Sequence, residues 1–290
     1  MANPNKRVPE SVPGDFFVDS TCIDCDACRQ IAPSVFGEAA DYSFVHTQPT
    51  SVADRRSAIH ALLACPTGSI GCLGDDDPKA VMNDFPLVVE EPVYYCGFNS
   101  PKSFGSNSYF IRRAEGNWLI DSPKFISPLI RRFDALGGIA HIFLTHRDDV
   151  ADADKYAERF GARRIIHKDE LSSQPDAEVV LEGKESFELA PGFVAVSTPG
   201  HTKGHCVLLF DQRFLFTGDH LAWNRDEKRL EAFHDYCWYS WPEQIESMRL
   251  LAKSNFEWVL PGHGQRVHLP AIAMSQQMRE LVERMRAEKD

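Results

Sequence analysis

The chain beyond residue 92 alternates between short apolar runs and longer stretches with helical spacing. The apolar runs are bounded by turn residues, which is typical of buried strands. Such runs occupy residues 93–98, 108–114, 117–121, 138–146, 192–198, 205–211 and 213–219, and the string EWVLPGHG at 257–264 lies between the last two predicted helices. Helical spacing predicts helices over residues 127–138, 149–162, 241–253 and 269–287. This part of the chain is therefore predicted to combine sheets and helices in layers.

The N-terminal part has a different character, because five of the eight cysteines lie before residue 73. An acidic stretch that contains several prolines follows, which is typical of a linker. We therefore predict a small N-terminal domain over 14–75, a linker over 76–92 and a larger domain over 93–290 that ends in a helix. A chain of 290 residues is long enough for two such domains.

Composition narrows the function classes. With 31 Lys and Arg against 42 Asp and Glu, the formal net charge is −11, which disfavours nucleic acid and anionic membranes as partners. No apolar stretch is long enough for a transmembrane helix, and the first residues lack the apolar core of a signal peptide. We therefore expect a cytoplasmic protein. Eight cysteines are too few for a disulfide scaffold in a chain of this length, and they indicate metal ligands or buried thiols.

Four of the cysteines have the spacing of an iron–sulfur site. Cys22, Cys25 and Cys28 form a C-x2-C-x2-C run, and Cys65, followed by Pro66, lies 37 residues after that run. Thiolates spaced by two residues can each reach a different iron of a cubane, and a remote fourth cysteine completes the set. A structural zinc site more often has two separate C-x2-C pairs.

Residues 16–72 resemble a single-cluster bacterial ferredoxin. The cysteine run, the string APSVFG at 32–37 and the string CPTGSI at 65–70 carry this resemblance. It implies one 4Fe–4S cluster bound by the four cysteines named above. We interpret the other four cysteines, among them Cys72, as ordinary thiols.

Histidines and aspartates follow the apolar runs of the larger domain. His146, His201, Asp219 and His263 occur in the strings LTHRDDVAD, TPGHTKGH, FTGDH and LPGHG, each after a predicted strand. Ligands gather beyond the carboxyl ends of strands in open α/β sheets. Imidazole and carboxylate groups that arrive from several loops are typical of a catalytic metal site.

The pattern between residues 88 and 268 resembles the metallo-β-lactamase superfamily, through the combination of PGHTxGH and LPGHG. It is most similar to the branch that contains hydroxyacylglutathione hydrolases (glyoxalase II), persulfide dioxygenases and flavodiiron proteins. The resemblance implies a four-layer αββα domain, so the whole chain is expected to be α+β, with a small ferredoxin-like domain in front. Asp121 matches a usual aspartate position of this fold and is expected to support the site.

The first metal motif departs from that family. Its usual form is H-x-H-x-D-H, and here Asp148 stands at the second histidine position after His146. The expected Asp–His pair comes two residues late, as Asp152 followed by alanine, so one histidine of a second metal is lost. Asp149, Asp152 and Asp154 also fit the acidic first turn of a helix, and this interpretation holds for at least one of them.

Two arrangements of metal remain open from the resemblance. Persulfide dioxygenases bind one iron at the positions of His146, His201 and Asp219, a set that leaves coordination positions for substrate or O2. Flavodiiron proteins instead have a carboxylate at the second motif position.

A flavodiiron-like site would use Asp148, with Asp219 as a bridge and with Asp152 and His263 on the far side. Exchange of an imidazole for a carboxylate makes the donor set harder, which shifts the preference from zinc towards iron. His205 and His220 are expected to pack beside the ligands rather than to bind metal.

Three functions are compatible with these patterns. The leading hypothesis is a redox enzyme in which the cluster exchanges electrons with a non-haem iron that acts on O2, a sulfur compound or another small oxidant, because a hydrolytic metal needs no electron source. The second is a metal-dependent thioester hydrolase with zinc or iron, a structural or redox-sensing cluster, and Asp148 or Asp152 orienting or deprotonating water. The third is a non-catalytic electron carrier or redox sensor. The acidic ferredoxin domain favours a basic reductase as electron donor.

Overall fold

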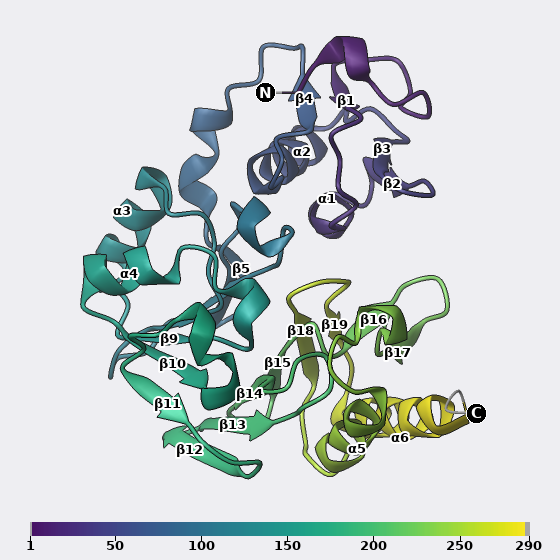
Figure 1. The fold of residues 1–290 in the computed structure, drawn as a ribbon. Coiled ribbons are helices and arrows are strands. Elements are labelled where there is room, and N and C mark those ends of the chain that lie inside the picture. The colour runs from purple at the N-terminus through teal and green to yellow at the C-terminus, as the bar shows by residue number, and fades with distance from the viewer. Residues whose placement is uncertain (1, 288–290) are drawn as a thin grey trace. The chain divides into compact units, whose positions relative to one another are not determined.

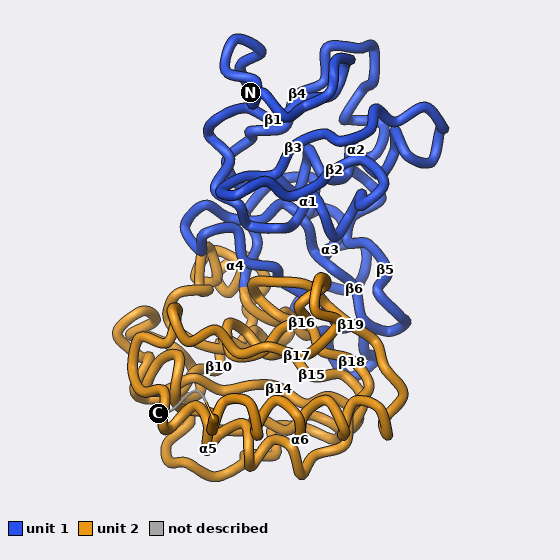
Figure 2. The backbone as a smooth tube through the Cα atoms, turned by 90° about the vertical axis from the view of Figure 1, so that its right-hand side faces the viewer, with its two compact units in different colours: residues 1–117, 122–139 blue, residues 118–121, 140–290 orange. Residues whose placement is uncertain are grey.

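The computed structural model describes residues 2–287 and divides the chain into two compact units (Figure 2). Unit 1 comprises Met1–Asn117 and Ser122–Ile139, and unit 2 comprises Trp118–Asp121 and Ala140–Asp290. This division differs from the predicted domains over 14–75 and 93–290, because the strands and the helix that precede residue 140 belong largely to unit 1.

Unit 1 begins with a small fold around two helices (Figure 1). Strand β1 (Phe16–Val18) pairs antiparallel with β4 (Ile70–Cys72), and β2 (Phe36–Glu38) pairs with β3 (Ser43–Val45). Helix α1 (Ala27–Ile31) packs on α2 (Val52–Ala64). Helix α2 begins at Val52 because the hydroxyl of Ser51 accepts a hydrogen bond from the amide of Asp54. The strands and helices enclose a continuous apolar core.

The stretch predicted as a linker, 76–92, contains regular structure. It forms the short 3-10 helices η2 (Pro78–Ala80) and η3 (Met82–Asp84) and the strand β5 (Leu87–Glu90). Strand β5 pairs antiparallel with β6 (Val93–Tyr95), which pairs with β7 (Tyr109–Ile111). Flanking Asp, Glu and Pro residues hide this four-residue strand in the sequence. Helix α3 (Ser127–Ala135) completes unit 1 and stacks Phe133 on Phe110 with ring centroids 4.9 Å apart.

The first sheet of unit 2 is parallel. Its strands are β8 (Trp118–Ile120), β9 (His141–Phe143), β10 (Arg163–His167) and β11 (Val179–Leu181). Parallel neighbours need a crossover connection, which helix α4 (Ala153–Phe160) supplies between β9 and β10. The helix ends at Gly161, whose φ of 65° lies in the left-handed region that glycine tolerates.

The second sheet of unit 2 is mixed. Its strands lie in the order β12 (Ser186–Ala190), β13 (Phe193–Ser197), β14 (Cys206–Phe210), β15 (Phe214–Gly218), β18 (Trp258–Pro261) and β19 (Val267–His268). Pairing is antiparallel except between β15 and β18. A hairpin of β16 (Ala222–Asn224) and β17 (Arg229–Glu231) lies between β15 and helix α5 (Trp241–Leu251).

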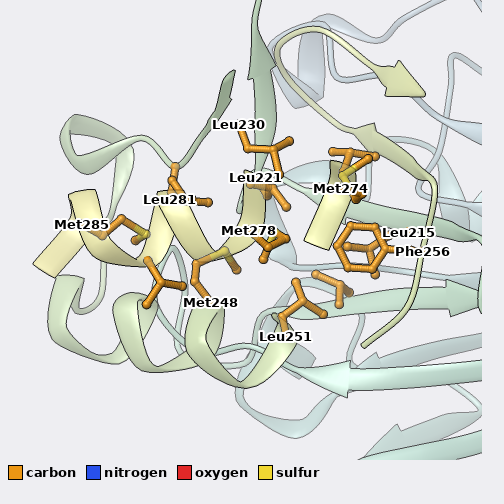
Figure 3. Packing of buried hydrophobic residues seen from close by; sticks show 14 of the residues in the cluster. Leu215, Leu221, Leu230, Met248, Leu251, Phe256, Met274, Met278, Leu281 and Met285 are labelled. Carbon is orange, nitrogen blue, oxygen red and sulfur yellow. The ribbon is translucent and has the colours of Figure 1, made fainter. Parts of the chain in front are cut away.

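Helices α5 and α6 (Ala271–Ala287) cover one face of this second sheet (Figure 3). Met274, Met278, Leu281 and Met285 follow one another along α6 at spacings of four, three and four residues and are all buried. They pack with residues of α5, the hairpin, the sheet and the loop before β18, including Met248, Leu251, Leu215, Leu230 and Phe256.

The two sheets of unit 2 meet through aromatic rings. The Trp118 ring of β8 lies 4.1 Å from the Phe193 ring of β13 at an interplanar angle of 11°. Helix α4 packs on β10 of the first sheet, and α5 and α6 pack on the second sheet. These layers of helix, sheet, sheet and helix confirm the α+β class and the αββα arrangement that we predicted. Within residues 2–287, no helix combines the length and apolar character that crossing a membrane requires.

Candidate metal centres

Four cysteines of unit 1 surround one cavity. Cys22 and Cys25 lie on the loop after β1, Cys28 lies in α1, and Cys65 caps the carboxyl end of α2. The loop can present successive thiols to the same cavity because Asp24 and Asp26 adopt φ angles of 56° and 63°. Aspartate is one of the few residues besides glycine that tolerates this left-handed conformation. We call these four residues the cysteine site.

The residues around the cysteine site fit an iron–sulfur cluster. Every cysteine is a free thiol within the described chain, so no disulfide competes for the site. The amide of Ser43 donates to Sγ of Cys22 at 3.5 Å, and the amide of Ser69 donates to Sγ of Cys65 at 3.3 Å. Backbone N–H groups directed at sulfur are among the groups that tune a bound cluster. Burial raises the pKa of Cys25 to about 12, so the unbound thiol is neutral at pH 7.

A buried arginine holds the cysteine loop. The Arg29 side chain is 4% exposed and forms ion pairs with Asp24 at 2.5 Å and Asp26 at 2.6 Å. It also donates to the Ser43 hydroxyl at 3.0 Å. Burial opposes the charge of Arg29, but the two carboxylates outweigh burial and raise its pKa. The loop is therefore fixed by charge-assisted bonds as well as by packing.

Histidine and aspartate side chains converge at the ends of four strands of unit 2. His146 follows β9, His201 follows β13, and Asp219 directly follows β15. The Asp219 Oδ2 atom lies 3.7 Å from Nε2 of His146 and 3.7 Å from Nε2 of His201. His263 follows β18, and its Nδ1 donates to Oδ1 of Asp219 at 2.7 Å.

Asp148 joins the two histidines. It lies in the 3-10 helix η5 (Arg147–Asp149), and its Oδ2 is 3.8 Å from Nε2 of His146 and 3.9 Å from Nε2 of His201. Its side chain is 50% exposed, so it borders both the histidines and solvent. We call His146, Asp148, His201 and Asp219 the metal site.

The metal site fits a metal ion. Nε2 of His146 and Nε2 of His201 are buried and make no hydrogen bond to any residue of 2–287. Such buried, unpaired nitrogens are costly unless another group satisfies them. The carboxylate oxygens of Asp148 and Asp219 lie 3.7–3.9 Å from Nε2 of each histidine, a spacing at which carboxylate and imidazole donors can contact one ion. Two imidazoles and two carboxylates would therefore hold the ion.

A hydroxyl relay orients the first ligand. Asp121, which follows β8, accepts hydrogen bonds from the amide of Thr145 at 2.9 Å and from its hydroxyl at 3.0 Å. The same hydroxyl lies 3.0 Å from Nδ1 of His146. Because the hydroxyl proton goes to Asp121, Nδ1 of His146 carries its own proton, and the Nε2 lone pair points into the metal site. Asp121 thus holds Thr145 and, through it, the His146 ring, while burial raises the pKa of the Asp121 carboxyl.

Burial changes the pKa values of the groups at the metal site. Burial lowers the pKa of His146 to about 3, so its imidazole is neutral at pH 7. Burial would raise the pKa of Asp219, but the charge of the His263 imidazole and its hydrogen bond to the carboxylate outweigh burial and lower that pKa. An ionised carboxylate beside the neutral imidazole of His146 is the protonation state that metal binding needs.

The acidic residues after His146 separate in the structure. Asp149 is buried, and one of its carboxylate oxygens lies within 4.8 Å of donor atoms of both His146 and Asp219. Asp152 precedes α4 and forms an ion pair with Lys155 at 2.9 Å. Asp154 is exposed in the first turn of α4. The sequence offered no signal that separates Asp149 from Asp152, because both lie in one acidic run.

Two more histidines lie behind the ligands. The rings of His205 and His220 are fully buried and stack with centroids 4.8 Å apart, and His205 lies 5.2 Å from the His146 ring. Burial lowers both pKa values, so the rings are neutral. Both rings therefore pack beside the metal site, and their supporting role stays a prediction.

Aromatic residues flank the same site. Trp238 is 63% exposed, and its ring lies 6.3 Å from that of His201. Its amide donates to the carbonyl of His201 at 2.9 Å, which ties the aromatic stretch to the ligand loop.

Comparison with known proteins matches both parts of the chain. A family model described as the 4Fe-4S single cluster domain of Ferredoxin I matches residues 18–72, and a model of the metallo-beta-lactamase superfamily matches residues 89–285. Among solved structures, DIM-1 metallo-β-lactamase exposed to ceftazidime is 20% identical with a TM-score of 0.51, covering 68% of this chain and 95% of that chain. TMB-1 is 17% identical with a TM-score of 0.51 and the same two coverages. These likenesses show the fold alone. The chain therefore belongs to the metallo-β-lactamase superfamily and carries a single-cluster 4Fe–4S ferredoxin domain before its lactamase-fold part, which supports a metal-dependent enzyme.

Proposed function

We propose that the chain is an oxidoreductase in which a 4Fe–4S cluster at the cysteine site exchanges electrons with a non-haem iron at the metal site. One observation carries the proposal: Asp148 lies against the two ligand histidines where the family pattern has a third histidine. Two imidazoles with two carboxylates form a harder donor set than three imidazoles, and such a set favours iron over zinc. A redox metal would also accept or donate the electrons that the ferredoxin domain carries, whereas a hydrolytic metal needs no electron source.

Each residue of the metal site would have a distinct role in the reaction. His146 is held as a neutral donor beside His201, and Asp219 supplies a carboxylate shared with His263. Iron bound there would supply one-electron chemistry and open positions for O2, a sulfur compound or another small oxidant. Asp148, half exposed beside the histidines, can accept a proton from the substrate or return one to it.

Charge and exposed surface support proposals for the external electron donor and for the substrate. The cluster domain is rich in acidic residues, so we propose a basic reductase as the electron donor. The exposed Trp238 near His201 offers an apolar surface to a small-molecule substrate. Asp152 remains a second candidate for proton transfer, although its ion pair with Lys155 favours Asp148 for this task.

A hydrolase is the alternative that the same geometry allows. Asp148 is accessible and Asp149 is buried beside Asp219, so either carboxylate could orient a water molecule towards a thioester. In that case the metal site would hold zinc or iron, and the cluster would be structural or a redox sensor. A non-catalytic electron carrier would need neither turnover nor an intact metal site.

Metal analysis and electron transfer test the proposal. Protein purified without added metal should contain iron beyond that of the cluster, and His201→Ala should lose only this additional iron. Cys25→Ser, as the matched control, should lose the cluster and keep the iron of the metal site. Paramagnetic resonance should show both centres, and a cluster reduced by dithionite should be reoxidised by O2 at least tenfold more slowly in His201→Ala.

Two results would overturn it. Zinc at the metal site, together with thioesterase turnover without a reductant, would establish the hydrolase. Equal rates of cluster reoxidation in the wild type and in His201→Ala would show that the metal site receives no electrons.

A further inference from the structure

A loop from the lactamase-family part of the chain packs on the cysteine site within unit 1. The amide of Asn99 donates to the carbonyl of Ala64, next to Cys65, at 3.1 Å. Asn99 is fully buried, and its side chain donates to the carbonyl of Gly105 at 2.7 Å and accepts from the Tyr95 hydroxyl at 2.7 Å. These bonds give the loop 99–105 a fixed shape against the end of α2.

Gly105 brings the loop into contact with the cysteine site. A Cβ atom at this position would lie 2.8 Å from Cβ and 3.2 Å from Sγ of Cys25, and 2.8 Å from Cγ of Pro66. Its φ of 85° is also one that other residues rarely adopt. Only glycine therefore allows the loop to approach Cys25 and Pro66 so closely.

Lys124 reaches the same side from a second segment. Its amide donates to the carbonyl of Phe98 at 2.9 Å, which fixes its backbone beside the loop. Its ammonium Nζ donates to the carbonyl of Pro66 at 2.8 Å, one residue from Cys65. The side chain is partly buried, so its charge acts in a less polar surrounding than bulk water.

We propose that Lys124 sets the reduction potential of the cluster by stabilising its reduced form. The inference rests on the proposed cluster and goes beyond the proposed reaction. Reduction adds one electron to the cluster from an external donor, and no bond or proton changes at Lys124. The added negative charge is attracted by the nearby ammonium, and both net charge and solvent exposure are known determinants of cluster potentials. Without Lys124 the cluster should be harder to reduce.

A redox titration of the complete protein, monitored by paramagnetic resonance of the reduced cluster, tests this role. Lys124→Gln keeps a donor for the Pro66 carbonyl and removes the charge, and Lys124→Met removes both. At the midpoint of the wild type, the ratio of reduced to oxidised cluster should fall about tenfold in both variants, which equals about 59 mV for one electron. Lys124→Arg, which keeps the charge, should stay within twofold of the wild type.

Lys102 supplies the matched control. Lys102 is exposed on the loop 99–105, so Lys102→Gln removes an equal charge that lies in bulk solvent. This variant should keep the ratio of reduced to oxidised cluster within twofold of the wild type. The role is overturned if the neutral variants at 124 keep the wild-type midpoint, if Lys102→Gln shifts it equally, or if both neutral variants fail to retain the cluster while Lys124→Arg retains it. A wild-type protein without any reducible cluster would instead refute the proposed cofactor.

Discussion

Glu170 is a fully buried carboxylate that joins the two loops carrying the ligand histidines. It lies in the 3-10 helix η6 (Lys168–Ser173), after β10. Its Oε1 accepts from the amide of Gly204 at 2.6 Å, and its Oε2 accepts from the amide of Arg147 at 3.2 Å. Arg147 follows His146 directly, and Gly204 lies three residues after His201. Glu170→Ala should therefore loosen both ligand loops at once.

The expected cost follows from the bonds that Glu170→Ala removes. Each hydrogen bond to a charged acceptor contributes about 1.5–3 kcal/mol, so loss of both should lower the free energy of unfolding by about 3–6 kcal/mol. Glu170→Gln keeps an oxygen for Gly204 and should cost about half as much. Loss of an orienting partner typically weakens metal binding 10–100-fold, and we expect this loss for Glu170→Ala.

Equilibrium urea unfolding of the metal-depleted protein measures the first effect, and competition with a chromophoric chelator measures the second. Glu182→Ala is the control, because Glu182 forms an exposed ion pair with Lys168, and such pairs contribute less than about 1 kcal/mol. The reasoning is refuted if Glu170→Ala costs no more than Glu182→Ala and binds metal with wild-type affinity.

Three further predictions concern other parts of unit 2. Thr145→Val removes the hydrogen bond to the His146 imidazole and should weaken metal binding 10–100-fold in chelator competition. Thr145→Ser should restore the affinity. Unchanged metal affinity in Thr145→Val would contradict the role of the Thr145 hydroxyl in orienting His146. Hydrogen bonds from Arg164 lower the pKa of Glu178 to about 2 from 4.5, so this pair stabilises the fold above pH 4.5 and loses its contribution as the pH falls towards 2. After screening, Glu178→Gln should cost about 1 kcal/mol at pH 7 and progressively less below pH 4.5 in urea unfolding, and a pH-independent cost would contradict this origin. Met278→Ala should lower the free energy of unfolding by about 2–5 kcal/mol, and Met278→Leu should lower it by less than about 1.5 kcal/mol. Equal losses in the two variants would show that the surroundings of Met278 in Figure 3 are loosely packed.

Local patterns made much of the fold predictable. The predicted strands over 192–198, 205–211 and 213–219 correspond to β13, β14 and β15 within one residue at each end. The predicted helix over 149–162 begins later, at Ala153, because His146 is followed by a 3-10 turn that directs Asp148 towards the histidines. The strand β5 was missed because its four residues are too few for periodicity to outweigh the acidic and proline-rich context.

The sequence by itself determined which residues could bind metal. The spacing of the cysteines can be recognised without a structure, because it involves residues that are close in sequence. The same holds for His146, His201 and Asp219, each of which follows an apolar run. Substitution of Asp148 for a histidine was equally visible.

Only the tertiary structure decided which groups support those ligands. Gly105 and Lys124 meet the cysteine site, and Glu170 joins two ligand loops, across separations along the chain that no local pattern encodes. Asp149 lies near Asp219, whereas Asp152 pairs with Lys155, and this difference depends on where the chain turns after His146. Such partners are selected by burial, since a buried polar group is stable only where the folded chain brings it a matching donor or acceptor.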